Sequence, residues 1–397
     1  MQIDRIVLKS GRDLALRRFH PWVFSGAIAR VEGSPQDGDP VAVYDKQNQF
    51  LGIGHFHHGS ITVRVLSFEP ADLNQPEFWI EKIQRALQAR QTAGLVPNPH
   101  TNCFRLIHGE GDGLSGLIID VYGDTAVVQC HSIGMHRQCA LIASALMRLQ
   151  GLTLQAVYDK SKETLPPQYA ELQTNGYLIG TDSLESVVVH ENDVQFKIDW
   201  VSGQKTGFFL DQRDNRQLLQ QYVQGKSVLN AFCYTGGFSA YALKAGAASV
   251  DSVDISGKAM EITEENARLN LPYPGVHTPY TEDVLRFLKN EGPLYEVMVI
   301  DPPAYAKSLE KRHNAIQGYK RLNEAAIRRL APGGILFTFS CSQVVDRELF
   351  YNTIVSAALE VGRHARVLHH LTQGADHPVS LFHPEGAYLK GLVLYID

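Results

Sequence analysis

Cysteine is scarce in this chain: 397 residues contain five, and no two of them form a C-x-x-C pair. Disulfide frameworks stabilise small secreted chains, and structural zinc sites usually need closely spaced cysteine pairs. The sequence therefore argues against a disulfide framework and predicts no metal site. The five cysteines are Cys103, Cys130, Cys139, Cys233 and Cys341.

Long hydrophobic runs are also absent. Apolar stretches such as residues 297–300 fall far short of the ~20 residues that a membrane-spanning helix requires. The first twenty residues contain charges throughout and lack the apolar segment of ~7–15 residues that a secretory signal carries. We therefore expect a cytoplasmic protein with no membrane partner.

Positive charge is in slight deficit, because 37 Lys and Arg stand against 42 Asp and Glu, a net charge of −5. Nucleic-acid-binding proteins usually carry a basic surface, so this average argues against such a partner. The distribution differs from the average. Residues 1–30 contain six basic side chains against two acidic ones, and residues 307–329 contain seven against two. These two basic segments keep a nucleic-acid partner open, although such runs also occur on solvated faces.

The length exceeds the ~250–300 residues at which a single hydrophobic core stops growing, so we expect two or three domains. Residues 1–70 contain short β-rich segments separated by turn residues, which predicts a small all-β module. Residues 71–190 open with a helical pattern and continue with mixed strands, which predicts an α+β domain. Within residues 191–397, strands alternate with helices from about residue 226, as is typical of a doubly wound parallel sheet.

The carboxyl ends of these predicted parallel strands carry a recurring set of residues. A turn from Asn230 to Gly237 follows the first strand, and its adjacent glycines let a ligand approach the backbone, although the spacing is not G-x-G-x-x-G. Asp254 ends the second strand, and Asp283 and Asp301 follow later elements. Each acid alone could cap a helix, but an acid at every strand end predicts a ligand site at this edge of the sheet.

The glycine turn, the aspartate at the end of the second strand and the sequence Asp301-Pro302-Pro303, called the D-P-P corner below, together resemble class I S-adenosylmethionine-dependent methyltransferases. In that family an acid in the position of Asp254 binds the ribose of the cofactor. Longer motifs narrow the resemblance: HPWVFSG at 20–26, GEGDGLSG at 109–116, KTGFFLDQR at 205–213 and TFSCS at 338–342. Together they resemble the 23S ribosomal RNA cytosine-C5 methyltransferases over nearly the whole chain. The resemblance implies a small β-barrel PUA domain, a central α+β domain and a C-terminal Rossmann-like α/β domain, in agreement with the three regions above.

The resemblance also implies a covalent mechanism that uses Cys341. Cytosine C5 is a weak nucleophile, and addition of a thiolate to C6 activates it before loss of the C5 proton expels the cysteine. Asp301 is the candidate residue for stabilising negative charge at N3 of the cytosine. It could equally hold the backbone of the Asp301-Pro302-Pro303 segment in place. Many related enzymes carry a second cysteine at this corner, where this chain reads Pro302-Pro303-Ala304. The base that removes the C5 proton is therefore unassigned, with water and Asp301 both open.

S-adenosylmethionine is the implied cofactor. Asp254 is expected to hold the ribose, Asp283 the adenine amino group, and backbone groups of the glycine turn the methionine part. Arg213 is expected to pair with the cofactor's carboxylate, or instead to form a structural ion pair with Asp211 or Asp214. The complete expected set is Gln212, Arg213, Asn230, Phe232, Tyr234, Gly236, Asp254, Asp283 and Asp301.

The implied partner is 23S ribosomal RNA, either naked or in an assembling subunit, and a homodimer is left open. The second basic segment follows the Asp301 corner and is expected to line the RNA entrance. The first lies in the PUA-like region and is expected to grip phosphates and shape rather than sequence. The expected RNA-contacting residues are Pro302, Tyr305, Lys307, Arg312, Lys320, Arg17 and Arg18.

Three alternatives stay open at this stage. Uracil-C5 methylation uses the same cysteine chemistry, whereas transfer to guanine N7 needs no covalent nucleophile and would leave Cys341 without a role. The chain could also be a ribosome-assembly RNA-binding protein with a catalytically inactive fold. The missing G-x-G-x-x-G disfavours an NAD-dependent dehydrogenase.

Overall fold

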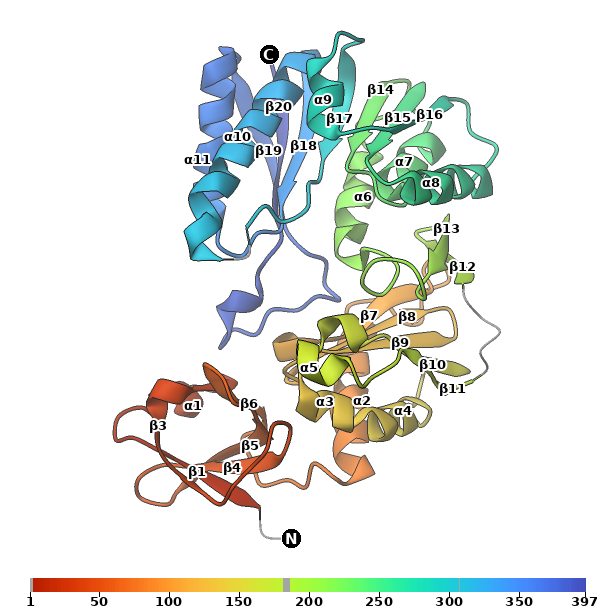
Figure 1. The fold of residues 1–397 in the computed structure, drawn as a ribbon. Coiled ribbons are helices and arrows are strands. Elements are labelled where there is room, and N and C mark those ends of the chain that lie inside the picture. Colours follow the sequence, from red (N-terminus) through yellow and green to blue (C-terminus); the bar gives the residue numbers. More distant parts are fainter. Residues whose placement is uncertain (1–2, 181–185, 307) are drawn as a thin grey trace. The chain divides into compact units, whose positions relative to one another are not determined.

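The computed structural model describes residues 3–180, 186–306 and 308–397 (Figure 1). The chain divides into two compact units, each with its own core. Unit 1 comprises Met1–Val189, Ile198–Leu210 and Ala375–Gly386, and unit 2 comprises His190–Lys197, Asp211–Gly374 and Ala387–Asp397. None of the helices in the described part of the chain combines the length and apolar composition that a membrane crossing needs.

The first sheet of unit 1 has six strands in the order β2-β6-β5-β4-β1-β3. Its strands are β1 (Asp4–Leu8), β2 (Trp22–Phe24), β3 (Ile28–Glu32), β4 (Pro40–Tyr44), β5 (Phe50–Phe56) and β6 (Ile61–Ser67), with the short helix α1 (Leu14–Arg17) after β1. The sheet is strongly curled (Figure 1), and its core includes the fully buried side chains of Ile6, Val41 and Val63. The strand β5 contains two glycines, Gly52 and Gly54, which weaken its strand pattern. Gly54 is required there, since a Cβ would lie 1.9 Å from the carbonyl oxygen of Arg64.

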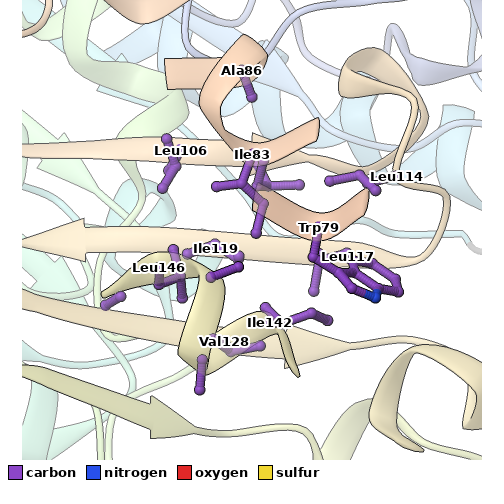
Figure 2. Packing of buried hydrophobic residues seen from close by; sticks show 14 of the residues in the cluster. Trp79, Ile83, Ala86, Leu106, Leu114, Leu117, Ile119, Val128, Ile142 and Leu146 are labelled. Carbon is purple, nitrogen blue, oxygen red and sulfur yellow. The ribbon is translucent and has the colours of Figure 1, made fainter. Parts of the chain in front are cut away.

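The second sheet of unit 1 has the order β11-β10-β9-β8-β7 and is covered by helices. Its elements are α2 (Pro76–Thr92), β7 (Cys103–His108), β8 (Leu117–Tyr122), β9 (Thr125–Cys130), α3 (Ile133–Arg137), α4 (Cys139–Leu146), β10 (Ala156–Asp159), α5 (Pro167–Ala170) and β11 (Gly176–Ile179). Figure 2 shows Trp79 and Ile83 of α2 beside Ile142 and Leu146 of α4, packed over strand residues such as Ile119. The buried positions of α2 recur at helical spacing, so one face of that helix enters the core.

Two later segments of the chain return to unit 1, which the expected boundary at residue 191 missed. Residues 198–210 return because the buried ammonium of Lys160 donates to the carbonyl oxygens of Trp200 and Gly203, and Thr206 donates to Asp120 at 2.6 Å. Residues 375–386 return because the carboxylate of Asp376 accepts the backbone N–H of Arg105 at 3.0 Å. Long-range side-chain anchors of this kind leave no signal in local composition.

Unit 2 is built on a seven-stranded sheet in the order β16-β15-β14-β17-β18-β20-β19, and β20 alone runs opposite to the other strands. Its elements are α6 (Arg213–Leu219), β14 (Ser227–Ala231), α7 (Gly237–Lys244), β15 (Ser249–Asp254), α8 (Gly257–Leu269), β16 (Val276–Thr281), α9 (Val284–Lys289), β17 (Tyr295–Ile300), α10 (Arg312–Arg329), β18 (Leu330–Ser340), α11 (Arg347–Val361), β19 (Ala365–Leu371) and β20 (Lys390–Ile396), with the ribbon β12 (Ser186–Glu191) and β13 (Val194–Asp199) preceding them. The predicted Rossmann-like α/β architecture is confirmed. The carboxyl ends of β14, β15, β17 and β18 therefore meet at one edge.

The helix α10 ends at Arg329, and residues 332–334 already belong to β18. A proline disfavours helical backbone in the residue before it, so Pro332 forces Ala331 out of the helix. The strand β16 has a weak strand pattern, because its sequence VHTPYT contains a proline and few apolar residues.

Candidate active site

Cys341 follows directly after β18, at the carboxyl edge of the unit 2 sheet. It is half-buried, whereas the other four cysteines are buried, and none of the five forms a disulfide among the described residues. Burial is the largest cause that raises the pKa of the Cys233 thiol above its ordinary value, which keeps that thiol protonated. A nucleophilic cysteine must reach both solvent and substrate as a thiolate. Cys341 is the cysteine whose placement fits this requirement.

Ser342 ties the Cys341 loop to three other elements. Its hydroxyl lies 3.0 Å from the hydroxyl of Tyr319 on α10 and accepts the backbone N–H of Ala306 at 3.4 Å. Its carbonyl oxygen accepts a hydrogen bond of 2.7 Å from the ammonium of Lys390 on β20. Ala306 ends the corner that begins at Asp301, so these contacts bring the predicted nucleophile loop and the D-P-P corner together.

Asp301 stands at the end of β17, and its carboxylate accepts a 2.9 Å hydrogen bond from the amide nitrogen of Gln212. Burial is the main cause that raises its pKa from 3.8 to about 7, and the nearby charge of Asp211 adds to the rise. The amide of Gln212 is oriented by Asn215, which donates to its oxygen at 2.6 Å. Asp301 is therefore present in both protonated and ionised forms near neutral pH, which suits a group that donates or accepts a proton.

The turn after β14 holds two aromatic residues in backbone conformations that L-residues rarely adopt. Phe232 has φ +59° and Tyr234 has φ +48°, and Gly236 follows with φ +77°. Such strain costs of order 1–3 kcal/mol per residue and is typical of ligand sites. At Gly236 a Cβ would lie 2.6 Å from Cγ2 of Thr263, so only glycine fits. The backbone of this turn therefore has a conformation that allows a ligand to approach it closely.

Asn230 and Asp254 complete the polar lining of this turn. Asn230 is buried, and its amide nitrogen donates to Ser239 at 2.8 Å, while its amide oxygen has no hydrogen-bond partner among the described residues. Asp254 accepts the backbone N–H groups of Tyr234 and Ser256, each at 3.0 Å. Each carboxylate oxygen keeps a second lone pair, which is free to accept a hydroxyl. The orphaned amide oxygen and the glycine that no larger residue can replace fit a bound cofactor here.

Asp283 is the N-cap of α9 and accepts the backbone N–H of Arg286 at 2.8 Å. The side chain is exposed, and capping already explains an aspartate at this position. Its expected contact with an adenine amino group stays a prediction.

Arg213 is buried and lies 3.4 Å from the carboxylate of Glu191, a fully buried acid at the end of β12. The same carboxylate receives two hydrogen bonds from Arg216, at 2.8 and 2.9 Å. Arg213 therefore takes part in a structural ion pair, as one of the two expectations held, and Glu191 is an acid of that pair. In the sequence of β12, Glu191 looks like any surface acid. Its role as the partner of two buried arginines is seen only from its burial in the structure.

The residues expected to contact RNA fall into separate groups in unit 2. Pro302 is buried, and the ring of Tyr305 packs against Tyr319 with centroids 4.7 Å apart. Arg312 is exposed at the start of α10, whereas Lys320 forms ion pairs with two acids, Glu324 and Glu360. Lys307 lies outside the described residues. Tyr305 is thus near the nucleophile loop, while Lys320 is already neutralised.

In unit 1, the two residues expected to contact RNA, Arg17 and Arg18, differ in whether their side chains form ion pairs. Arg17 pairs with Asp13 at 2.6 Å and with Asp45 at 2.5 Å. Arg18 is exposed, and within the described residues its side chain forms no ion pair. Arg18 therefore offers a charge for phosphate, whereas Arg17 stabilises the fold around α1.

Two side-chain groups in unit 1 have a composition that could bind a metal ion, namely His20 with His383 and Glu385, and His136 with Cys139 and Asp159. In the first, Nδ1 of His20 accepts the backbone N–H of Trp22, so Nε2 carries the ring proton and is no ligand. In the second, both ring nitrogens of His136 have partners, Tyr169 at 3.0 Å and Asp159 at 3.1 Å. Hydrogen bonds account for both ring nitrogens of His136, whereas neither ring nitrogen of His383 has a hydrogen-bond partner among the described residues.

Comparison with known proteins gives consistent matches in both units. A family model of PUA-like domains matches residues 6–68, and a model of S-adenosylmethionine-dependent methyltransferases matches residues 144–382. "Ribosomal RNA large subunit methyltransferase I" of Aeromonas hydrophila subsp. hydrophila is 41% identical over 398 residues, with 98% of each chain covered. The protein of the same name from Tolumonas auensis is 37% identical, again with 98% of each chain covered.

Solved structures agree on the fold. A Streptococcus mutans protein described as a SAM-dependent methyltransferase superposes with a TM-score of 0.82 and 22% identity, covering 99% of this chain and 100% of that one. A methyltransferase solved in complex with SAH gives a TM-score of 0.83 and 21% identity, with the same shares covered.

Proposed function

The chain belongs to the S-adenosylmethionine-dependent methyltransferases named ribosomal RNA large subunit methyltransferase I, and from that premise we propose that it methylates C5 of a cytosine in 23S ribosomal RNA. Its PUA-like domain and its cofactor, S-adenosylmethionine, follow from the family. The cytosine, the carbon atom and the covalent route through Cys341 are our proposal.

The placement of Cys341 carries this proposal. A half-buried thiol at the carboxyl edge of the sheet, linked through Ser342 to the Asp301 corner, suits an attack on a base held at that corner. In the proposed mechanism, the thiolate of Cys341 adds to C6 of cytosine, and C5 thereby gains the nucleophilicity that transfer requires. Loss of the C5 proton then breaks the bond between sulfur and C6 and regenerates the free cysteine.

Asp301 supports the same chemistry. Addition at C6 pushes negative charge onto N3 and O2 of the base, and a protonated carboxyl beside N3 would stabilise that charge. A pKa of about 7 keeps a substantial protonated fraction of Asp301 at neutral pH. The amide of Gln212 donates to one carboxylate oxygen of Asp301, and in the proposed mechanism the other oxygen would lie beside N3 of the base.

The cofactor supplies an electrophilic methyl group. The turn from Asn230 to Gly236 would hold its methionine part through backbone groups, and Asp254 would accept hydrogen bonds from its ribose. The unpartnered amide oxygen of Asn230 and the strained turn support this assignment.

The direct test is transfer of labelled methyl to extracted ribosomal RNA, followed by nucleoside analysis. We expect label in 5-methylcytidine with the wild type and loss of transfer with Cys341→Ala. Cys103→Ala, which removes a buried thiol in unit 1, is the matched control and should retain transfer. Label in 5-methyluridine or 7-methylguanosine, or full transfer by the Cys341 variant, would contradict the proposal. Binding of RNA without measurable cofactor affinity by calorimetry would instead favour a non-catalytic assembly protein.

A further inference from the structure

Lys390 is a buried cation beside the proposed nucleophile. It begins β20, pairs with Ser340 in the antiparallel register of β18 and β20, and is 5% exposed. Its ammonium donates to the carbonyl oxygen of Ser342 at 2.7 Å, one residue beyond Cys341. Lysine is almost never fully buried unless it is paired, so a buried ammonium at this place needs an explanation.

No carboxylate provides that explanation within the described residues, because none forms an ion pair with Lys390. Burial lowers the pKa of Lys390 from 10.5 to about 8, and the group that opposes this fall most strongly is Cys341. Asp346 also raises the pKa, and Arg347 lowers it. Among the charged groups near Lys390, the thiolate form of Cys341 therefore has the largest effect on the pKa of this lysine.

The surroundings leave Lys390 within reach of water. A cavity of about 290 Å³ is lined by Lys390 together with Arg347, Glu348, Tyr351 and His370. On the other side of the loop, burial raises the pKa of Tyr319, so its hydroxyl stays protonated and adds no charge.

We propose that Lys390 is a positioning residue that holds Cys341 as a thiolate. The proton leaves Sγ of Cys341 for solvent water while Lys390 stays an ammonium, so the S–H bond breaks, an O–H bond to water forms, and no electrons are exchanged with any other group. The ammonium anchors the loop through Ser342 and stabilises the sulfur's negative charge. The catalytic consequence rests on the proposed function, in which Cys341 is the nucleophile.

The positive charge of Lys390 favours ionisation of the neighbouring thiol. A free thiol has a pKa of ~8.5, so only a few per cent is ionised at pH 7. An amine with a pKa of about 8 is mostly protonated at pH 7, and a nearby ammonium favours the thiolate. Lys390 thus acts on Cys341 through its charge, without touching the substrate.

The test measures the thiol rather than methyl transfer. The rate of alkylation of Cys341 by iodoacetamide is followed from pH 5.5 to 10 in the full chain without RNA or cofactor, with the modified peptide identified by mass spectrometry. Lys390→Gln keeps a hydrogen-bond donor and removes the charge, and it should raise the midpoint by about one pH unit, a roughly tenfold loss of thiolate at pH 7. Lys390→Arg should restore a midpoint near that of the wild type.

Lys226→Gln is the matched control, because Lys226 pairs with Glu296 at the amino end of the sheet. It should leave the midpoint unchanged. An unchanged midpoint in a folded Lys390→Gln protein would overturn the proposal, as would a raised midpoint in Lys390→Arg. If Lys390→Gln fails to fold, Lys390→Met provides the uncharged variant and the same comparison applies. These outcomes are separate from the proposed function, which fails if Cys341→Ala still methylates RNA whatever the thiol pKa is.

Discussion

Replacement of Asp301 by asparagine should make the protein more stable at alkaline pH. The pKa of Asp301 is about 7 in the folded chain against an ordinary value of 3.8. Between these two values the unfolded chain is ionised while the folded chain still holds the proton, so the stability of the wild type falls as the pH rises from about 4 to about 7. One pKa unit corresponds to about 1.4 kcal/mol, so the loss above pH 7 is of order 4 kcal/mol.

Asparagine cannot ionise and removes this loss. Urea unfolding at pH 8.5 and at pH 4 measures the difference: the variant should be more stable at pH 8.5 by up to about 4 kcal/mol, with a much smaller difference at pH 4. Asp283→Asn is the control, since asparagine caps a helix as well as aspartate does, and its stability should not change with this pH pattern. A wild type as stable as Asp301→Asn at pH 8.5 would refute the assigned pKa.

Activity should move in the opposite direction. If protonated Asp301 stabilises N3, wild-type transfer must fall as the pH rises through about 7, because the protonated fraction disappears. Asp301→Asn should lose this alkaline limb and at neutral pH be slower by at least about tenfold. A stability gain joined to an activity loss identifies a residue kept for chemistry rather than for folding. An unaltered pH profile of transfer in the variant would exclude the N3 role.

Three further predictions follow from single contacts. Gly236→Ala should weaken cofactor affinity, measured by calorimetry, and lower stability by roughly 2–4 kcal/mol from backbone strain and overpacking; unchanged affinity would contradict the assigned turn. Glu191→Gln should cost about 3–5 kcal/mol of unfolding free energy in urea, because the buried guanidinium of Arg216 would lose the carboxylate of Glu191. Arg18→Ala should weaken RNA binding and lower the salt slope by about one in filter-binding assays, whereas Arg17→Ala should act mainly on thermal stability. Equal effects of the two arginines on RNA binding would disprove that separation.

The sequence was sufficient to predict those parts of the fold and of the site in which chemically distinctive residues lie at the ends of clearly patterned strands. The alternation of strands and helices predicted the unit 2 sheet, and the strand ends predicted that Cys341 and Asp301 lie at one edge. The glycine turn was also recognisable from its composition. The parallel strands had to deliver these residues to the same place, because all of them run in one direction.

What the sequence missed depends on contacts between distant segments. Lys390 follows Cys341 by almost fifty residues on a strand that runs the opposite way, and only the register of β18 and β20 places it next to Ser342. Glu191 became notable only when its burial beside Arg213 and Arg216 was known. Local sequence patterns carry no information on such pairings. The burial and the partners of charged residues such as these can therefore not be predicted from the sequence.

The most direct measurement for the central claim is covalent capture. RNA that contains 5-fluorocytidine carries fluorine where the C5 proton should leave, so the adduct cannot resolve and should remain attached to the enzyme. We predict a complex stable to denaturation with the wild type in the presence of S-adenosylmethionine, and tandem mass spectrometry should place the nucleotide on Cys341. The Cys103→Ala control should form the same complex. A complex formed only with 5-fluorouridine, attachment at another residue, or capture by Cys341→Ala would contradict the account.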